Sequence, residues 1–239
     1  MSFGTVSAAY ERGRPEYPDE VVDWLLPDRS ARVIEIGSGT GKFTRSLVRC
    51  GVSVTATEPD PGMRAAFSAG DVEVIAGTAE AIPAADGSAD AVLAAQCWHW
   101  VDPERASREV GRVLVPGGVL GVLWNDRDES DQWVSELSSI LTEADRIRAA
   151  DAEPVPFPPF ERFERSVMRW EHNVSVDGVV DMVGSRSFAI ALPPDQRATL
   201  LDRVRRHALA HPSINGDTFA MPYVTRAYRA HATIAADQE

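Results

Sequence analysis

The segment that most constrains the fold lies near the N-terminus, in residues 33–44. A short apolar run with one acidic residue leads directly into Gly37, Gly39 and Gly41, and a helical pattern follows at once. This order predicts a strand, a tight turn and a helix, the unit that opens many nucleotide-binding α/β sheets. Because glycine has no Cβ, it allows unusual backbone angles and lets the main chain lie against a ligand. The spacing is G-x-G-x-G, and therefore differs from the G-x-G-x-x-G of dinucleotide-binding enzymes.

Composition limits the classes of protein that fit. The 239 residues suffice for one large domain, or for a core domain with an elaboration. The formal net charge is −12, which argues against a nucleic-acid substrate, because binding to nucleic acid depends largely on a basic surface. We expect a small-molecule substrate instead, and the sequence leaves the oligomeric state open.

Targeting and redox features are also readable from the sequence. The N-terminus lacks a basic segment followed by an apolar core, so we expect no signal peptide. No apolar run approaches the ~20 residues of a membrane span. Cys50 and Cys97 show no metal-type spacing, and His207 and His211 lack a third ligand, so neither a disulfide framework nor a metal site is expected. A cytoplasmic protein without a membrane partner is the resulting prediction.

Strand and helix patterns alternate along the first half of the chain. A helix is expected from residue 18 or 19, and Pro116, Gly117 and Gly118 indicate a turn. The predicted strands are residues 32–36, 52–57, 72–76, 89–95 and 119–124, and the predicted helices between them are 42–49, 61–68 and 103–114. Strands separated by helices imply a mostly parallel sheet that is covered on both faces.

The second half of the chain has a different character. Residues 125–131 are polar, and residues 150–160 carry four prolines, which predicts a loop. Helices are expected at 132–148, 176–185 and 195–209, and strands at 163–174 and 218–228.

Polar and glycine residues gather where the predicted strands end. In an open α/β sheet, ligands bind outside the carboxyl ends of the strands. The residues at five consecutive strand ends are Gly37–Gly41, Glu58, Thr78–Glu80, Gln96–Trp100 and Asn125. We therefore expect these five ends to face one ligand site.

Glu58 is the second anchor of that site. It stands 17 residues after Gly41. This distance suits an acid whose carboxylate accepts hydrogen bonds from both ribose hydroxyl groups. The alternative is a solvated acid in a turn before Pro59. The combination with the glycine turn favours the ribose role.

Four ordered segments carry a family resemblance. Residues 35–41, 57–63, 77–83 and 112–118 read EIGSGTG, TEPDPGM, GTAEAIP and RVLVPGG. With them, residues 7–125 resemble the class I S-adenosylmethionine-dependent methyltransferases. The pattern around Tyr10, Arg14 and Tyr17, with His99-Trp100, resembles the small-molecule branch of trans-aconitate methyltransferase-like proteins. Two positions depart from the family pattern, because Thr78 and Glu35 stand where many members have Asp.

The resemblance implies a fold, a cofactor and a division of the chain. The fold is a Rossmann-like, seven-stranded, mostly parallel sheet with helices on both faces. Residues 1–30 would form an N-terminal arm and helix, a candidate lid, and 31–125 the S-adenosylmethionine-binding core. Residues 126–239 would supply the last two strands and a helical substrate cap. The cofactor-binding residues implied are Tyr10, Arg14, Glu35, Gly37, Ser38, Gly39, Gly41, Glu58, Pro59, Met63, Thr78, Ala79, Glu80, Gln96 and Trp98.

The chemistry implied is methyl transfer to a small molecule by in-line displacement. Alignment and exclusion of water supply most of the acceleration in such a reaction, so a general base is optional. His99 is the candidate base, and its alternatives are an orienting or a structural role. The candidate substrate residues are Tyr17, Trp100, Asn125, Arg127 and Arg186.

Two other functions stay open at this stage. A nicotinamide-dependent oxidoreductase also uses a glycine turn and a ribose acid, although the glycine spacing here disfavours it. A non-catalytic cofactor-binding scaffold is the other, because a fold alone never proves turnover. The sequence does not identify the acceptor or the methylated atom.

Overall fold

The computed structural model describes residues 11, 13–26, 28–141, 153–212 and 217–233. These residues form one seven-stranded sheet in the order β3-β2-β1-β4-β5-β7-β6. Strands β1 to β5 run parallel, whereas β7 is antiparallel to both β5 and β6. The strands are β1 Arg32–Ile36, β2 Ser53–Thr57, β3 Val74–Ile75, β4 Ala89–Ala95, β5 Leu114–Arg127, β6 Glu164–Ser175 and β7 Thr218–His231. The predicted fold class is confirmed.

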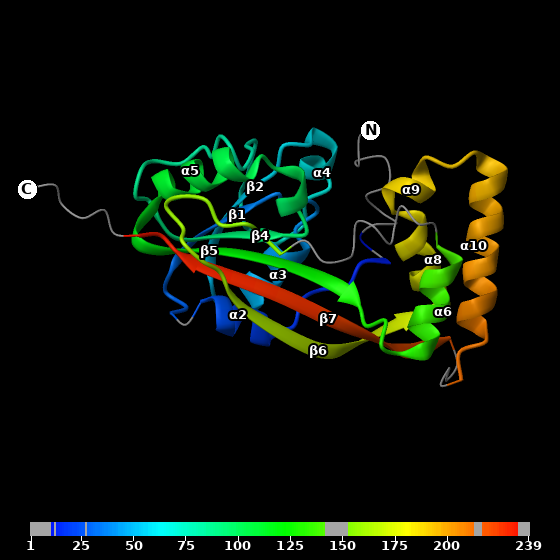
Figure 1. Ribbon diagram of the computed structural model, residues 1–239. Coiled ribbons are helices and arrows are strands. Elements are labelled where there is room, and N and C mark those ends of the chain that lie inside the picture. Colours follow the sequence, from blue (N-terminus) through cyan, green and yellow to red (C-terminus); the bar gives the residue numbers. More distant parts are fainter. Residues whose placement is uncertain (1–10, 12, 27, 142–152, 213–216, 234–239) are drawn as a thin grey trace, which may run out of the picture.

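Helices cover both faces of the parallel half of the sheet (Figure 1). On one face lie α2 and α3, and on the other α5. The helices of the first half are α2 Asp19–Leu25, α3 Lys42–Arg49, α4 Pro61–Ala65 and α5 Pro103–Val113, with a 3₁₀ turn η2 at Trp98–Trp100. Asp60 and Asp102 cap α4 and α5 through their carboxylates, which satisfies backbone N–H groups that a helix start leaves open.

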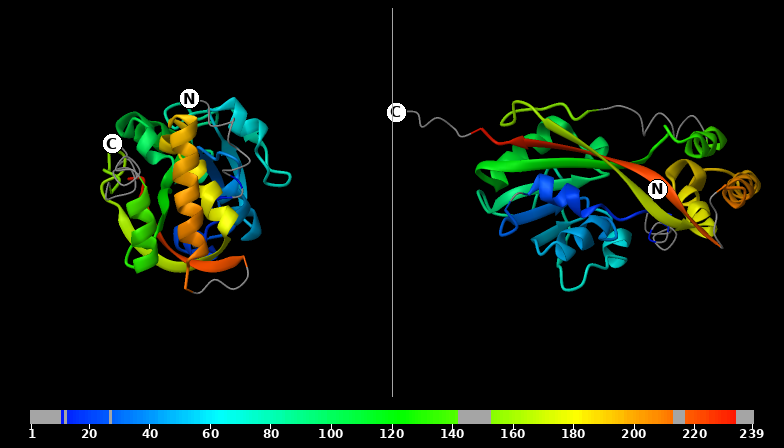
Figure 2. Two further views of the ribbon diagram at one scale, coloured as in Figure 1. Left: turned by 90° about the vertical axis from the view of Figure 1, so that its right-hand side faces the viewer. Right: turned by 90° about the horizontal axis from the view of Figure 1, so that it is seen from below.

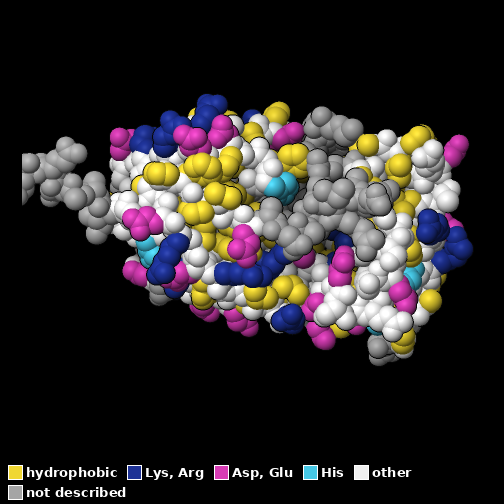
Figure 3. Space-filling model, in the orientation of Figure 1, with side chains coloured by type: hydrophobic (Ala, Val, Ile, Leu, Met, Phe, Trp, Pro, Cys, Tyr) yellow, Lys and Arg dark blue, Asp and Glu magenta, His cyan; other side chains and the backbone are white. Residues whose placement is uncertain are grey.

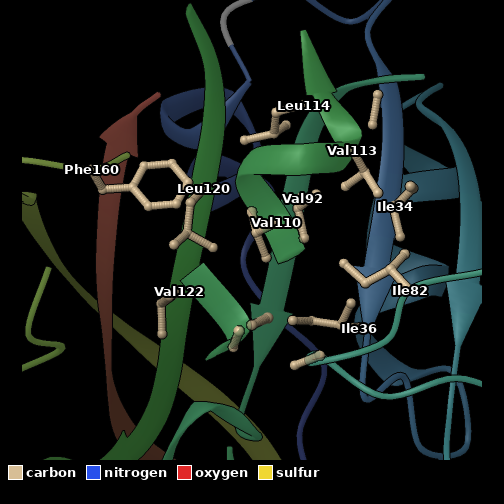
Figure 4. Packing of buried hydrophobic residues seen from close by; sticks show 14 of the residues in the cluster. Ile34, Ile36, Ile82, Val92, Val110, Val113, Leu114, Leu120, Val122 and Phe160 are labelled. Atoms are coloured by element: carbon tan, nitrogen blue, oxygen red, sulfur yellow. The ribbon is translucent and has the colours of Figure 1, made fainter. Parts of the chain in front are cut away.

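Side chains of alternate strand residues build two separate cores. Ile34 of β1 and Val92 of β4 pack with Val110 of α5 (Figure 4). Val33 and Leu93, which are direct neighbours of these residues on the same strands, point to the opposite core, which α2 and α3 cover. This alternation follows from the two-residue period of a strand, and it holds the central strands between two apolar layers.

A second group of helices packs at the far end of β6 and β7. The members are α6 Gln132–Ile140, α8 Val176–Gly184, α9 Ser187–Ile190 and α10 Pro194–Leu209. Figures 1 and 2 show them as a layer beyond the parallel half of the sheet. Trp133 of α6 and Val179 of α8 pack against Met221 of β7 in this third core. The proposed division after residue 125 falls inside β5, which continues to Arg127.

Helix α5 also fixes the loop that follows β3. Arg112 donates to the carbonyl of Ile82 at 3.1 Å and to the carbonyl of Ala84 at 2.9 Å. It also pairs with the carboxylate of Asp86 at 2.6 Å. Glu109 accepts from the Ile82 N–H at 2.8 Å. The loop at the carboxyl end of β3 is therefore held by a network of ion pairs and hydrogen bonds.

Charged side chains of both signs are interspersed on the face shown in Figure 3.

The structure corrects several predicted boundaries. Pro116, Gly117 and Gly118 lie inside β5 as an irregularity, since pairing passes from Ala89 with Leu114 to Ala91 with Val119. Proline is tolerated at such a bulge because its missing N–H is not needed there. The strand predicted at 72–76 shortens to β3, and the helix predicted at 132–148 ends at Ile140. Residues 142–148 of that prediction lie outside the described residues.

Two other features bear on the sequence predictions. Cys50 and Cys97 are both free thiols. Among the residues that the structure describes, no helix has both the length and the apolar character needed to cross a membrane.

Candidate functional site

A cleft of about 680 Å³ opens at the carboxyl ends of the parallel strands. It receives residues from all five predicted strand ends, so these ends face one cleft. Gly37 and Gly39 follow β1, and Glu58 follows β2. Thr78, Ala79 and Glu80 follow β3, Gln96 follows β4, and Asn125 lies near the end of β5. Ligand sites of this volume are typical for small molecules and cofactors.

The glycine turn requires its glycines for different reasons. Gly37 and Gly39 have φ values of +64° and +58°, in the left-handed region that other L-residues rarely adopt. A Cβ on Gly37 would lie 2.7 Å from the Cβ of Cys97, whereas one on Gly39 would meet no protein atom within 4 Å. Gly37 therefore allows close packing inside the protein, and Gly39 leaves the cleft side of the turn bare.

Glu58 joins the end of β2 to the glycine turn. Its Oε2 accepts from the N–H of Gly39 at 2.9 Å, and its Oε1 accepts from the N–H of Asp60 at 2.8 Å. The side chain is buried, and burial raises the pKa of its carboxyl against the two backbone hydrogen bonds, which lower it. A carboxylate has about four acceptor positions, so this one can accept further hydrogen bonds from a ligand in the cleft.

A second acid lies behind the turn. Glu35 is 1% exposed and accepts a hydrogen bond from the Thr44 hydroxyl at 2.6 Å. Burial raises the pKa of Glu35 to about 8, and the nearby charge of Glu58 acts in the same sense. Burial also raises the pKa of the Cys97 thiol, which donates to the Ile36 carbonyl at 3.2 Å. Glu35 thus supports the turn from inside without lining the cleft.

The cleft also contains basic side chains. Arg14 and Arg186 line it together with Asp126. Asp126 pairs with Arg226 at 2.6 Å, and burial raises its pKa while the charges of Arg226, Arg186 and Arg127 lower it. The cleft lining thus includes two arginines beside the ion pair of Asp126 with Arg226.

Aromatic side chains form the mouth of the cleft. Trp124 and Trp100 line it with His99, and Trp100 is 55% exposed. The Trp124 indole N–H donates to Nδ1 of His99 over 3.4 Å. Trp98 takes another position, because it is 5% exposed and packs in the core beneath α5.

The N-terminal segment lies against the cleft. The side-chain Nδ2 of Asn125 donates to the Glu16 carbonyl at 3.0 Å. Gly13 packs on α8 so closely that a Cβ there would lie 2.2 Å from the backbone nitrogen of Met182. Tyr17 is buried edge-on against Phe43, with ring centroids 4.9 Å apart.

The structure brings most of the predicted site residues together. Those that line the cleft are Arg14, Gly37, Gly39, Glu58, Pro59, Met63, Thr78, Ala79, Glu80, Gln96, His99, Trp100, Asn125 and Arg186. Those that do not are Tyr17, Glu35, Ser38, Gly41, Trp98 and Arg127, while Tyr10 lies outside the described residues. Tyr17 lines a separate small cavity together with Arg14 and Lys42. The other described residues of this second group do not line the cleft.

Sequence reasoning missed several residues of the cleft. These are Ile36, Asp60, Pro61, Val101, Trp124, Asp126 and Ser185. Most are direct neighbours of predicted site residues, so a wider window at each strand end would include them. Ser185 directly precedes the predicted site residue Arg186, but it lies at no strand end and follows helix α8.

Comparison with known proteins gives consistent results. A family model described as a methyltransferase domain matches residues 34–122. An uncharacterized methyltransferase of Mycobacterium tuberculosis is 46% identical over 234 residues, which are 96% of this chain and 95% of that protein. An uncharacterized methyltransferase-like protein of Schizosaccharomyces pombe is 33% identical, over 95% of this chain and 94% of that one. The solved structure of a proposed type II methyltransferase from Anaeromyxobacter dehalogenans shares the fold, with a TM-score of 0.69 and 22% identity over 92% of this chain and 98% of that chain.

Proposed function

Because the chain belongs to the class I S-adenosylmethionine-dependent methyltransferases, we propose that it methylates a small-molecule acceptor bound in the cleft. The observation that carries this proposal is the link between Glu58 and the glycine turn. The 2.9 Å bond from the Gly39 N–H places a carboxylate beside a bare stretch of backbone, within a cleft of about 680 Å³. That arrangement suits the ribose and the methionine part of S-adenosylmethionine.

The residues present fit S-adenosylmethionine at this end of the cleft. Glu58 would accept from the ribose hydroxyls, and Gly37 and Gly39 would let the backbone approach the ligand. Met63, Thr78 and Ala79 line the adjoining wall, on the side of the loop that α5 holds. Glu35, Ser38 and Gly41 would act by supporting the turn. The acidic lining from Glu58, Asp60 and Glu80 also suits a positively charged donor.

When bound, S-adenosylmethionine supplies a methyl group that is already activated by a positive sulfur. The protein then has to bind the acceptor in line with the bond to that methyl and to exclude water. Trp100 and Trp124 would form apolar walls at the mouth for this purpose. The helical layer that contributes Ser185 and Arg186 would act as the acceptor cap.

His99 fits an orienting role better than that of a general base. The Trp124 N–H points to Nδ1 of His99, and an indole N–H is only a donor. Neutral His99 therefore carries its proton on Nε2, which makes that nitrogen a donor. A base would need the reverse, an unprotonated nitrogen directed at the acceptor.

The acceptor class rests on Arg186. This residue lines the cleft, and guanidinium groups bind carboxylates and phosphates through paired hydrogen bonds. We therefore propose an acceptor with an anionic group, which agrees with the resemblance to trans-aconitate methyltransferase-like proteins.

The test combines binding and turnover. Calorimetry with S-adenosylhomocysteine should detect binding, and release of that product should be measured over small carboxylic acids, phosphate esters, and neutral or cationic amines and phenols. We expect turnover with an anionic acceptor, and Arg186→Met should raise its KM roughly tenfold while changing affinity for S-adenosylhomocysteine less than about twofold. Cofactor binding without turnover on any acceptor would favour a non-catalytic scaffold. Turnover confined to neutral or cationic acceptors would overturn the acceptor class alone.

A further inference from the structure

Asn125 is a cleft residue whose side-chain oxygen and nitrogen both form hydrogen bonds with the protein. It is 8% exposed. Its Oδ1 accepts from the Thr225 hydroxyl at 2.6 Å, while its Nδ2 donates to the carbonyl of Glu16 at 3.0 Å. A side chain that served the substrate would direct these groups into the cleft, so the contacts point to another role.

The chain of hydrogen bonds continues through the sheet. Thr225 lies on β7 and is 0% exposed, and its hydroxyl oxygen accepts from the indole N–H of Trp170 on β6 at 2.9 Å. The three residues thus connect β5, β7 and β6, which are neighbours in the sheet. The series of hydrogen bonds begins at Trp170, which does not line the cleft, and ends at Glu16.

The direction of this chain is fixed by chemistry. An indole N–H can only donate, so the Thr225 oxygen accepts from it and has its single proton left for Asn125. The oxygen of the Asn125 amide must then face Thr225, and its NH₂ must face Glu16. Trp170 and Thr225 therefore select one of the two amide orientations, the one that can hold the Glu16 carbonyl.

Gln96 adds a strained contact to the same residue. It has a φ of +59° and is the one non-glycine residue with a positive φ in the described ranges. Its side-chain Nε2 donates to the backbone carbonyl of Asn125 at 2.7 Å. Strain of this kind persists where surrounding contacts enforce it, and such positions cluster at ligand sites. The pair joins the ends of β4 and β5 at the cleft wall.

The segment that Asn125 holds brings a cation to the cleft. Arg14 stands two residues before Glu16 and lines the cleft together with Gly37 and Gly39. Gly13, on its other side, is seated on α8 next to Met182. The Tyr17 N–H donates to the Ser46 hydroxyl of α3 at 3.4 Å. Residues 13–17 therefore cross from the helical layer to the parallel sheet, with Asn125 at the crossing.

We propose that Asn125, oriented by Thr225 and Trp170, is a positioning residue that holds residues 13–17, and with them Arg14, against the bound cofactor. This inference rests on the proposed function, since it assumes that the cofactor occupies the glycine end of the cleft. Asn125 acts through the segment and does not touch the reacting atoms.

The test uses two substitutions of Thr225, which does not line the cleft. Thr225→Val keeps the shape and removes the hydroxyl, whereas Thr225→Ser keeps the hydroxyl and removes a methyl group. Affinity for S-adenosylhomocysteine is measured by calorimetry, and amide hydrogen exchange is followed in residues 13–17. We expect Thr225→Val to lose affinity about fivefold to tenfold and to exchange faster in that segment. Thr225→Ser should stay within about twofold of the wild type in both measurements.

Each outcome decides between the alternatives. Unchanged affinity and exchange in Thr225→Val overturn the proposal, and equal losses in both variants, in step with their thermal stability, reduce Thr225 to a packing role. If Thr225→Val does not fold, Trp170→Phe removes the first donor of the chain and should give the same changes with smaller size; their absence overturns the proposal. If wild-type protein fails to bind S-adenosylhomocysteine, the proposed function fails, and exchange in the free protein still tests the restraint of residues 13–17.

Discussion

The two ends of the cleft are built in different ways. The end with the glycine turn comes from residues close together in the sequence, since Gly37, Gly39 and Glu58 directly follow the adjacent parallel strands β1 and β2. The other end combines Asn125 and Asp126 of β5 with Arg186 of the turn after α8. The first end therefore follows from a local sequence pattern, whereas the second depends on contacts between residues that are distant in the sequence.

The largest effect should follow a change at the bare glycine. Gly39→Val adds a branched side chain at a φ of +58°, facing the ligand space, and should lower affinity for S-adenosylhomocysteine roughly 100-fold or more. Gly51→Val is the matched control, because Gly51 also has a positive φ, of +79°, and open space around it, but does not line the cleft. Calorimetry that found equal affinity losses in both variants would contradict the assignment of the glycine end to the cofactor.

A smaller loss should follow removal of the charge on Glu58. Glu58→Gln keeps the shape of the side chain but replaces one oxygen by a donor, which must then face the N–H of Gly39 or Asp60, or the ligand. We expect affinity to fall roughly 30-fold, because hydrogen bonds to a charged acceptor are the stronger ones. Glu73→Gln, in an exposed residue beside β3, serves as the control. Titrations that give the same affinity for both variants would remove Glu58 from the site.

The smallest effect on affinity, with a clear effect on stability, is expected for Glu35→Gln. The pKa of Glu35 is about 8 in the folded protein against an ordinary value of 4.5. Between these pH values the unfolded chain releases the proton while the folded protein keeps it, so stability falls as the pH rises, by up to about 1.4 kcal/mol per pH unit. Glu35→Gln should flatten this part of the dependence of unfolding free energy on pH, as measured by denaturant titrations from pH 5 to 8. An unchanged slope would mean that Glu35 ionises normally and is not part of a buried support for the turn.

The predictions from sequence succeeded best in the parallel half. Strand β1, helix α3 and strand β4 begin and end at the predicted residues, because each has an apolar run or a helical period with a clear stop. Trp98 was expected at the cofactor yet packs under α5, since its neighbours His99 and Trp100 have the same local signal and only the 3₁₀ turn decides which ring faces inward. Ser185 also lines the cleft, although it follows α8 and lies at no strand end.

The sequence by itself determined the order of strands and helices, the glycine turn and the acid that faces it, because all of these depend on residues within one strand–turn–helix unit or the next. Tertiary structure decided what closes the cleft. The bonds from Asn125 to Glu16 and to Thr225 join residues 109 and 100 positions apart, and which of many polar side chains meet over such distances is set by the packing of the whole sheet. Hydrophobic periodicity specifies which face of an element is buried, whereas the partner of a single amide group depends on the final register of β5 against β7.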